Sequence, residues 1–389
     1  MKFARHSRRL MHTRSGWICA PDSFKGTVDS VTAARGLAQG LHPLPTRVLP
    51  MGDGGEGTAL AIEASQGGRW VNTSLGPARL GGPPQKGRWL DLGNRCAFVE
   101  FAQGAALETV PSTHPPDPGK MSSHPVGELI CSALDSGARR LVIGLGGSGT
   151  VDGGAGLLQA LGGRFQAAGT TLRAPITASD LQILESLDLT EVRRRFRGIS
   201  CTLAADVVNP LLGPQGAIAQ YGAQKGLRPE EFVRFEEGLR RFSRLMGAKA
   251  DQPGDGAAGG AAFGLRAGAG GTLVAGAQLV GTLVGLQEAC SSAEWVVTGE
   301  GRYDDQTRQG KVPWAVARCA RACGAKVALV AGQIDPATLP EIKRMFDFHL
   351  ELSGCLKDVT ASSGTESALQ EAGRQLRVRL ASSKPPLEP

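Results

Sequence analysis

The sequence predicts an α/β protein built on parallel sheets, and three observations support this class. Short apolar runs recur along the chain, and each leads directly into a polar, glycine-rich loop. Apolar residues at helical spacing follow the first run. A hydrophobic content of 41%, with 55 glycines and 23 prolines in 389 residues but no collagen-like period, indicates ordered turns. This alternation of strand, loop and helix is typical of parallel sheets with right-handed crossovers.

Six of these apolar runs are the predicted strands, and helical patterns lie between them. The runs read WICA, TRVLPM, LVIGLG, CTLAA, WVVTG and KVALVAG, at residues 17–20, 46–51, 141–146, 201–205, 295–299 and 326–332. The helical face after the first run is formed by Val28, Val31, Ala34, Leu37 and Leu41. An amphipathic helix with a solvated charged face is predicted over 229–245.

The length of the chain and a change in its pattern predict two domains. A chain of 389 residues exceeds what one hydrophobic core usually organises. Between about 76 and 118 the sequence breaks into short pieces interrupted by glycine and proline, so a differently built region begins there. We expect the ends, 1–15 and 381–389, to be disordered tails, because the first is basic and the last is polar and proline-rich.

The charge distribution argues against a nucleic-acid partner. The formal net charge is +7, but five basic residues lie in the first fifteen positions, which contain no acid. The remaining 38 of the 43 basic residues nearly balance 36 acidic ones, so the body of the chain is close to neutral. A basic tail that contacts anionic surfaces is the alternative to a solvated or wrongly started N-terminus.

Cysteine usage and hydropathy predict a cytoplasmic protein without a membrane partner. The eight cysteines show no CxxC and no zinc spacing, and Cys319 and Cys323, four apart, are interpreted as a core pair. No apolar run reaches the ~18 residues of a spanning helix, and the N-terminus lacks the apolar region of a signal peptide. Its arginines without acids leave a transit peptide as the alternative.

Acidic side chains lie in the loops that follow five of the predicted strands, and most of these loops are rich in glycine. Because ligands of open α/β sheets bind beyond the carboxyl ends of strands, these positions are candidate site residues. A single acid beside a glycine is usually a turn residue, but five such exits together favour a site. The exits carry Asp22 with Lys25, Asp53 with Glu56, Asp152, Asp206 with Asn209, and Glu300 with Arg302, Asp304 and Asp305.

Two glycine-rich segments are candidate phosphate loops, because glycine lets backbone N–H groups approach a phosphate before a helix. One contains Gly146, Gly147, Ser148 and Thr150, and the other contains Gly310 and Lys311 before Pro313. Neither has the spacing of a P-loop or of GxGxxG. Carboxylates would hold Mg²⁺, and lysine and arginine would bind phosphates, an inventory that matches phosphoryl transfer. All of the six histidines except His124 lie away from these loops, which disfavours a hydrolase triad.

Seven segments, in order, resemble the type I glycerate kinase family: APDSFKG, PMGDGGEGT, GGSGTVDGGAG, DVVNPLLGPQGA, YGAQKG, GAAGG and TGEGRYDDQTRQGK. The resemblance runs from about Ile18 to Gly332. It implies a discontinuous Rossmann-like three-layer domain (16–75 plus 290–380), an inserted α/β domain (76–289) and an active cleft between them. The implied reaction transfers the γ-phosphoryl group of ATP to D-glycerate, giving 2-phosphoglycerate and ADP. The oligomeric state stays open, with a homodimer as one possibility.

The resemblance implies a set of site residues, to which we assign roles. Mg²⁺ is assigned to Asp206 and Glu300. ATP is assigned to Gly146, Gly147, Ser148, Thr150, Lys225, Gly310 and Lys311. Glycerate is assigned to Ser23, Lys25, Asp53, Glu56 and Arg302. The general base is Asp22 or Asp304, so the catalytic set is Asp22, Lys25, Arg302 and Asp304. For each role the alternative is a structural residue behind the site.

The sequence departs from the family pattern at three places in its middle region. Val151 stands where the family usually has asparagine, and His124 and Pro125 replace an aromatic residue and a glycine. The stretch EFAQGAAL at 100–107 also differs. These departures leave two alternatives open: a kinase for a related hydroxy acid, and a non-catalytic sensor of a small acid or nucleotide.

Overall fold

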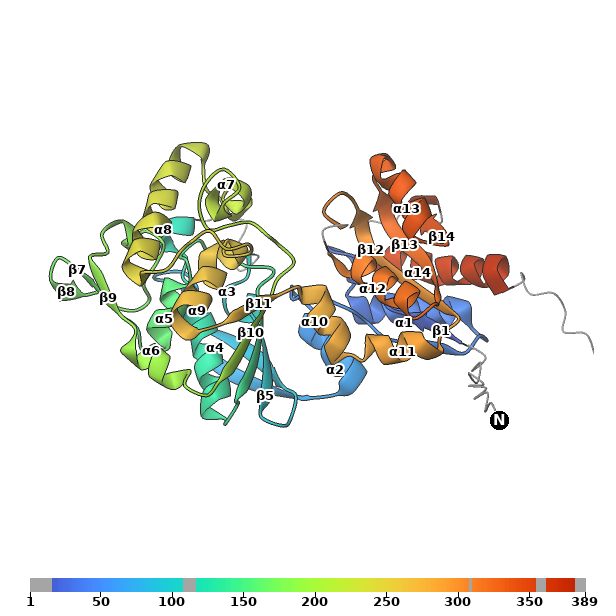
Figure 1. The fold of residues 1–389 in the computed structure, drawn as a ribbon, viewed down its shortest axis with the longest axis horizontal. Coiled ribbons are helices and arrows are strands. Elements are labelled where there is room, and N and C mark those ends of the chain that lie inside the picture. The colour runs from blue at the N-terminus through green and yellow to red at the C-terminus, as the bar shows by residue number, and fades with distance from the viewer. Residues whose placement is uncertain (1–15, 108–116, 308–309, 355–361, 382–389) are drawn as a thin grey trace, which may run out of the picture. The chain divides into compact units, whose positions relative to one another are not determined.

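The computed structural model describes residues 16–107, 117–307, 310–354 and 362–381. The chain divides into two compact units (Figure 1). The first unit contains Met1–Pro50, Gly285–Asp305 and Pro313–Pro389. The second unit contains Met51–Val284 and Gln306–Val312. The first unit therefore combines segments from both ends of the chain.

The first unit is built on a five-stranded sheet with the order β14-β13-β12-β1-β2, in which every neighbouring pair is parallel. Its strands are β1 (Trp17–Cys19), β2 (Thr46–Val48), β12 (Trp295–Tyr303), β13 (Lys326–Ile334) and β14 (Phe348–Glu351). Helices lie on the faces of this sheet, so the central strands are buried and read as continuous apolar runs. The rings of Trp17 and Trp295, paired in register, stack with centroids 5.5 Å apart.

The helices of the first unit are α1 (Ser30–Leu41), α11 (Leu286–Ser292), α12 (Val312–Ala322), α13 (Leu339–Met345) and α14 (Ser362–Leu376). Helix α1 begins after Asp29, whose carboxylate accepts a hydrogen bond from the Thr32 N–H at 2.7 Å. It packs along α14 (Figure 1). A Cβ at Gly40 would lie 2.0 Å from the carbonyl oxygen of Gln370, so glycine is required for this close approach.

The second unit contains a mixed six-stranded sheet with the order β11-β10-β6-β5-β4-β3. Strands β5, β6, β10 and β11 are parallel, whereas β3 and β4 form an antiparallel extension. The bounds are β3 (Arg69–Leu75), β4 (Gln85–Asp91), β5 (Cys96–Glu100), β6 (Arg140–Gly144), β10 (Ser200–Ala204) and β11 (Thr272–Val274). A small antiparallel sheet consists of β7 (Arg164–Ala167), β8 (Thr170–Thr171) and β9 (Ser186–Asp188).

The helices of the second unit surround these sheets. They are α2 (Thr58–Gln66), α3 (Ala102–Ala105), α4 (His124–Asp135), α5 (Ala155–Ala160), α6 (Thr190–Arg195), α7 (Ala217–Tyr221), α8 (Phe232–Met246), α9 (Ala261–Ala269) and α10 (Gly276–Leu283). Helix α8 is the predicted amphipathic helix, with Phe235, Leu239 and Phe242 buried in the core. Across the described ranges, no helix combines the length and apolar character needed to cross a membrane.

All six predicted strands are present, as β1, β2, β6, β10, β12 and β13. Strand β12 is longer than predicted, and the added residues include candidate site residues. β12 continues past residue 299 because Arg302 and Tyr303 pair with Gln333 and Ile334 of β13. Glu300 and Arg302 therefore lie within a strand, not in the loop after it.

The unit boundaries differ from the predicted domain boundaries at 75/76 and 289/290. The chain passes between units at 50/51 and 284/285, and residues 306–312 also belong to the second unit. Residues 69–75 belong with the second unit because β3 pairs along its whole length with β4. The expectation of disordered tails concerns residues that, apart from Ala381, lie outside the described ranges.

Candidate active site

The loop before α2 carries Asp53 and Glu56 in the second unit. The Asp53 Oδ1 accepts a hydrogen bond from the Gly55 N–H at 2.8 Å, and the Gly54 N–H donates to the Thr58 Oγ1 at 3.1 Å. These bonds shape a tight turn whose Glu56 side chain is exposed. The loop is thus held by its own side chains just before a helix N-terminus.

The predicted phosphate loop after β6 packs directly on this turn. The Gly146 N–H donates to the Gly54 carbonyl at 3.0 Å. A Cβ at Gly146 would lie 2.4 Å from the Cα of Gly55, so a larger residue there would push the two loops apart. Gly147 is exposed. The glycines of both motifs therefore serve a backbone-to-backbone contact at the carboxyl ends of the strands.

The carboxylate of Asp206, a residue that follows β10, caps the N-terminus of α10. Its Oδ1 accepts from the Gly276 N–H at 2.6 Å and its Oδ2 from the Ala277 N–H at 3.1 Å. Burial is the larger cause that raises the pKa of Asp206 to about 7, and the charge of Asp53 adds to it. The charge of Lys311 opposes this rise. The Asp53 carbonyl oxygen lies against Gly276, so the structure brings Asp53, assigned to glycerate, and Asp206, assigned to Mg²⁺, to the same helix end.

Asn209, in the same segment, has a structural role. Its Oδ1 accepts from the Tyr221 hydroxyl at 2.6 Å, and its Nδ2 donates to the Gln215 carbonyl at 2.9 Å. These bonds brace the loop between β10 and α7. Val208, between Asp206 and Asn209, is 63% exposed.

Three residues assigned to ATP are buried in the second unit. Lys225 is 3% exposed, and its Nζ donates to the Ser148 Oγ at 2.9 Å and to the Thr150 carbonyl at 2.8 Å. Thr150 is fully buried, and its Oγ1 has no hydrogen-bond partner among the described residues. Direct contact with a ligand would require these groups to become exposed.

Asp152 is also fully buried, and its carboxylate is heavily hydrogen-bonded. It accepts from the Ser123 N–H and hydroxyl at 2.8 and 2.7 Å, and from the Gly154 and Gly156 N–H groups at 3.1 and 3.3 Å. Burial raises the pKa of Asp152, while these bonds oppose the rise. The acid of this strand exit therefore organises the loop before α5.

Sequence reasoning missed Glu100, at the carboxyl end of β5. Its Oε1 accepts from the Ala59 N–H in the first turn of α2 at 2.7 Å. Burial raises the pKa of Glu100 to about 7; the Ala59 and Gln103 hydrogen bonds oppose the rise, and the charge of Glu56 adds to it. The signal was available, because Glu100 follows an apolar run just as the other acids do.

In the first unit, the segment after β1 lies against β12. The Asp22 N–H donates to the Gly299 carbonyl at 2.8 Å, and the Asp22 Oδ1 accepts from the Ser23 N–H at 2.7 Å. A Cβ at Gly301 would lie 3.2 Å from the backbone nitrogen of Lys25, and the Lys25 side chain is exposed. The structure therefore brings the motif after β1 and the motif in β12 together within this unit.

The β12 residues differ in exposure. Glu300 is 6% exposed, whereas the Arg302 side chain is 67% exposed. The Arg302 Nε lies 4.0 Å from the Asp304 Oδ2. An exposed guanidinium beside a half-buried carboxylate is suited to bind an anion near a proton acceptor. Gly310, in the second unit, has φ +121°, a conformation that favours glycine.

Two carboxylates of the second unit could hold Mg²⁺. No three histidine, cysteine, aspartate or glutamate side chains in the described ranges form a group that could hold a metal ion. Mg²⁺ uses only one or two protein carboxylates together with waters and phosphate oxygens, which suits the Asp53 and Asp206 pair. The assigned ligands Asp206 and Glu300 belong to different units.

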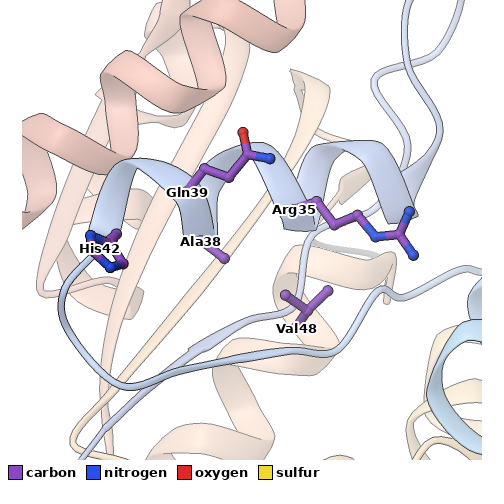
Figure 2. A pocket seen from close by; sticks show the side chains of 5 residues that line it. All are labelled: Arg35, Ala38, Gln39, His42 and Val48. Carbon is purple, nitrogen blue, oxygen red and sulfur yellow. The ribbon is translucent and has the colours of Figure 1, made fainter.

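A surface hollow of about 480 Å³ lies elsewhere, in the first unit (Figure 2). It is lined by Arg35, Ala38, Gln39, His42 and Val48. These residues belong to α1, the turn after it and the edge strand β2. No candidate site residue lines this hollow.

Acidic, glycine-rich loops at the carboxyl ends of parallel strands are typical of α/β enzymes that bind a ligand there, and this chain has that arrangement. Residues 17–381 match the model of the glycerate kinase family. The chain belongs to the glycerate kinase family.

Relatives and a solved structure show the same similarity. The chain is 37% identical to a glycerate kinase of Bacillus subtilis over 82% of this chain and 85% of the relative. It is 35% identical to a glycerate 2-kinase of Escherichia coli, with the same coverage. A crystal structure of a Salmonella typhimurium LT2 protein assigned as glycerate kinase 2 matches with a TM-score of 0.80 and 32% identity, covering 95% of this chain and 99% of that one.

Proposed function

We propose that this protein transfers the γ-phosphoryl group of Mg·ATP to D-glycerate in the cytoplasm, giving 2-phosphoglycerate and ADP. The observation that carries this proposal is the meeting of Asp53 and Asp206 at the N-terminus of α10. Asp206 accepts hydrogen bonds from the first two N–H groups of this helix, and the Asp53 carbonyl oxygen lies against Gly276. The charge of Lys311 acts on the same Asp206 carboxyl group. Two carboxylates and a cation beside glycine-rich loops are the groups that phosphoryl transfer requires. Membership of the glycerate kinase family supports glycerate as the acceptor.

In this proposal the second unit handles the phosphates. Asp206 and Asp53 hold Mg²⁺, which moves Asp53 from the glycerate assignment made from the sequence to the metal. Glu300, also assigned to Mg²⁺ from the sequence, belongs to the first unit. Bound Mg²⁺ supplies neutralisation of phosphate charge. The amides of the loop at 146–150 and the Lys311 ammonium bind phosphate oxygens. Asp206 already accepts two amide hydrogen bonds, so its carboxylate is held in one orientation before any ligand arrives.

The first unit handles the acceptor in the same proposal. Lys25 and Arg302, both exposed, bind the carboxylate of D-glycerate. Asp22 or Asp304 accepts the proton of the attacking hydroxyl. Ser23 remains assigned to glycerate, as does Glu56 of the second unit. The departures from the family pattern lie inside the second unit, where Val151 is buried in the core and Pro125 occupies the first turn of α4.

The proposal is tested by ADP release in the presence and absence of Mg²⁺, with D-glycerate, L-glycerate, tartronate and glycolate as acceptors. We expect Mg²⁺-dependent turnover that is fastest with D-glycerate. Faster turnover of another acid would assign a related hydroxy acid as the substrate. Nucleotide binding without turnover of any acid, in folded protein, would favour the sensor and reject the kinase.

A further inference from the structure

Lys225 is buried beneath the glycine-rich loop of the second unit. It ends a 3-10 helix, Ala223–Lys225, and only 3% of its surface is exposed. Its Nζ donates to the Ser148 Oγ at 2.9 Å and to the Thr150 carbonyl at 2.8 Å. Both acceptors belong to the loop, 77 and 75 residues away in sequence. One side chain therefore ties two points of the loop to a distant segment.

Both hydrogen-bond acceptors of this ammonium, a hydroxyl and a carbonyl oxygen, are uncharged. The charged group that acts on it is Asp152, whose own carboxylate is bound by four donors. Burial lowers the pKa of Lys225 to about 7, and Asp152 only partly offsets this effect. A lysine buried at an electrostatic cost, with two hydrogen bonds to the loop, points to a role that these bonds perform.

The loop that Lys225 holds is the one that packs on the Asp53 turn. The Gly146 N–H donates to the Gly54 carbonyl at 3.0 Å, and the Gly149 N–H donates to the Ala105 carbonyl at 2.9 Å. These backbone bonds hold the loop at Gly146 and Gly149. Lys225 adds bonds at Ser148 and Thr150, on either side of Gly149, and so helps to determine how the second half of the loop runs.

We propose that Lys225 is a positioning residue, which acts through Ser148 and Thr150 to align the loop at 146–150 and does not itself contact a phosphate. This inference rests on the proposed function, because it takes the loop as the phosphate-binding element. It differs from the role assigned from sequence alone, in which the ammonium touched ATP. A buried ammonium with both its bonds inside the unit acts on a ligand only through the loop that it holds.

Hydrogen exchange in the unliganded full chain tests the bracing directly. The variant is Lys225→Met, which keeps the apolar stem and removes the donors, and the control is Lys249→Met, at an exposed lysine. We expect amide exchange in peptides covering 144–150 to become roughly tenfold faster in Lys225→Met, because a lost charged hydrogen bond is worth about this factor or more. Peptides covering β10 serve as the internal reference. Unchanged loop exchange, or an equal change in β10, would overturn the proposal.

Nucleotide affinity and a double-mutant cycle test the consequence. We expect the Kd for Mg·ADP and the KM for ATP to rise roughly 10- to 100-fold in Lys225→Met, with kcat changed by less than about threefold. In a Ser148→Ala background the same substitution should have a smaller effect, since part of the bracing is already lost. Full additivity, or unchanged affinity despite faster exchange, would contradict positioning through the loop. If the wild type fails to phosphorylate D-glycerate, the proposed function fails, while exchange and Mg·ADP affinity still decide the role of Lys225.

Discussion

Asp53 and Asp206 meet at the first residue of α10: the Gly276 N–H donates to the Asp206 Oδ1 at 2.6 Å, and a Cβ on Gly276 would run into the Asp53 carbonyl oxygen. Burial raises the pKa of Asp206, and the charge of Asp53 adds to this rise. Each carboxylate is also fixed, Asp53 by the Gly55 N–H and Asp206 by two amides of α10. Two like charges held together without a cation repel each other. The pair is therefore arranged to gain from a cation, which is the chemical basis of the Mg²⁺ assignment.

Replacing Asp53 by asparagine should lower the pKa of Asp206. A pKa raised from 3.8 to about 7 contributes stability below pH 3.8 that is lost as pH rises through 7. In Asp53→Asn this loss should be smaller by about 1 kcal/mol, because the repelling charge is gone while the bond from Gly55 is kept. Denaturant unfolding at several pH values between 4 and 8 without Mg²⁺ measures it. Asp135→Asn, with a side chain 71% exposed, is the control. Parallel stability profiles for wild type and Asp53→Asn would contradict the coupling.

Glu100→Gln should make the second unit more stable at pH 8 but not at pH 4. The raised pKa of Glu100 contributes stability below 4.5 that is lost as pH rises through 7, and glutamine has no charge to bury. The amide oxygen still accepts the Ala59 N–H. We expect a gain of up to about 3 kcal/mol at pH 8, measured by urea unfolding. Glu230→Gln, at an exposed site, should show no such pH-dependent gain. A variant less stable than wild type at pH 8 would mean that the Glu100 charge is needed.

Thr150→Val tests the buried hydroxyl of the glycine-rich loop. Valine keeps the shape and removes an Oγ1 that has no partner among the described residues, so stability should rise by about 1 kcal/mol. Thr150→Ser keeps the hydroxyl and removes a methyl group, and should be less stable than wild type. Thermal melts of the two variants make the comparison. A destabilised Thr150→Val would show that the hydroxyl has a partner in solution, and lost nucleotide affinity would support the ATP contact assigned from the sequence.

Six strands, and the loops that follow them, could be predicted because buried parallel strands are continuous apolar runs in the sequence. The placement of β3 could not, because its partner β4 is antiparallel and neither strand has such a run. The extension of β12 to Tyr303 depends on its pairing with β13, and the two glycines of GEGR gave no sign of this pairing. Sequence patterns reveal burial along one element, but pairing between elements depends on the tertiary structure.

The candidate site was predictable in its residue types and less so in its groupings. Acids beside glycines marked Asp53 and Asp206, yet their pairing depends on where α10 begins, and nothing in the local sequence shows this. The burial of Lys225 likewise arises from a short 3-10 helix lying under a loop. Glu100 was overlooked because it was compared with a family pattern and not with the other strand exits.

Lys311→Met should reduce turnover much more than stability. Its charge lies near Asp206, where it opposes the raised pKa of that carboxyl, and it follows Gly310 before α12. Loss of one charge-assisted phosphate contact should cost on the order of 2–4 kcal/mol in the transition state, or roughly 30- to 1,000-fold in rate. Stability should change by no more than about 1 kcal/mol. Steady-state kinetics beside a thermal melt separates the two effects. Wild-type kcat/KM for ATP would remove Lys311 from the site.

The product formed from Mg·ATP and D-glycerate decides whether this protein is a kinase that phosphorylates the 2-hydroxyl of D-glycerate. A phosphoryl group on the 2-hydroxyl has one vicinal proton, so the 31P signal of the product splits into a doublet, whereas a group on the 3-hydroxyl has two and gives a triplet. We expect ADP and a new doublet to appear together and to require Mg²⁺. If folded protein gives no ADP and no phosphorylated glycerate, the protein is not a glycerate kinase, and a triplet would contradict the assignment of 2-phosphoglycerate.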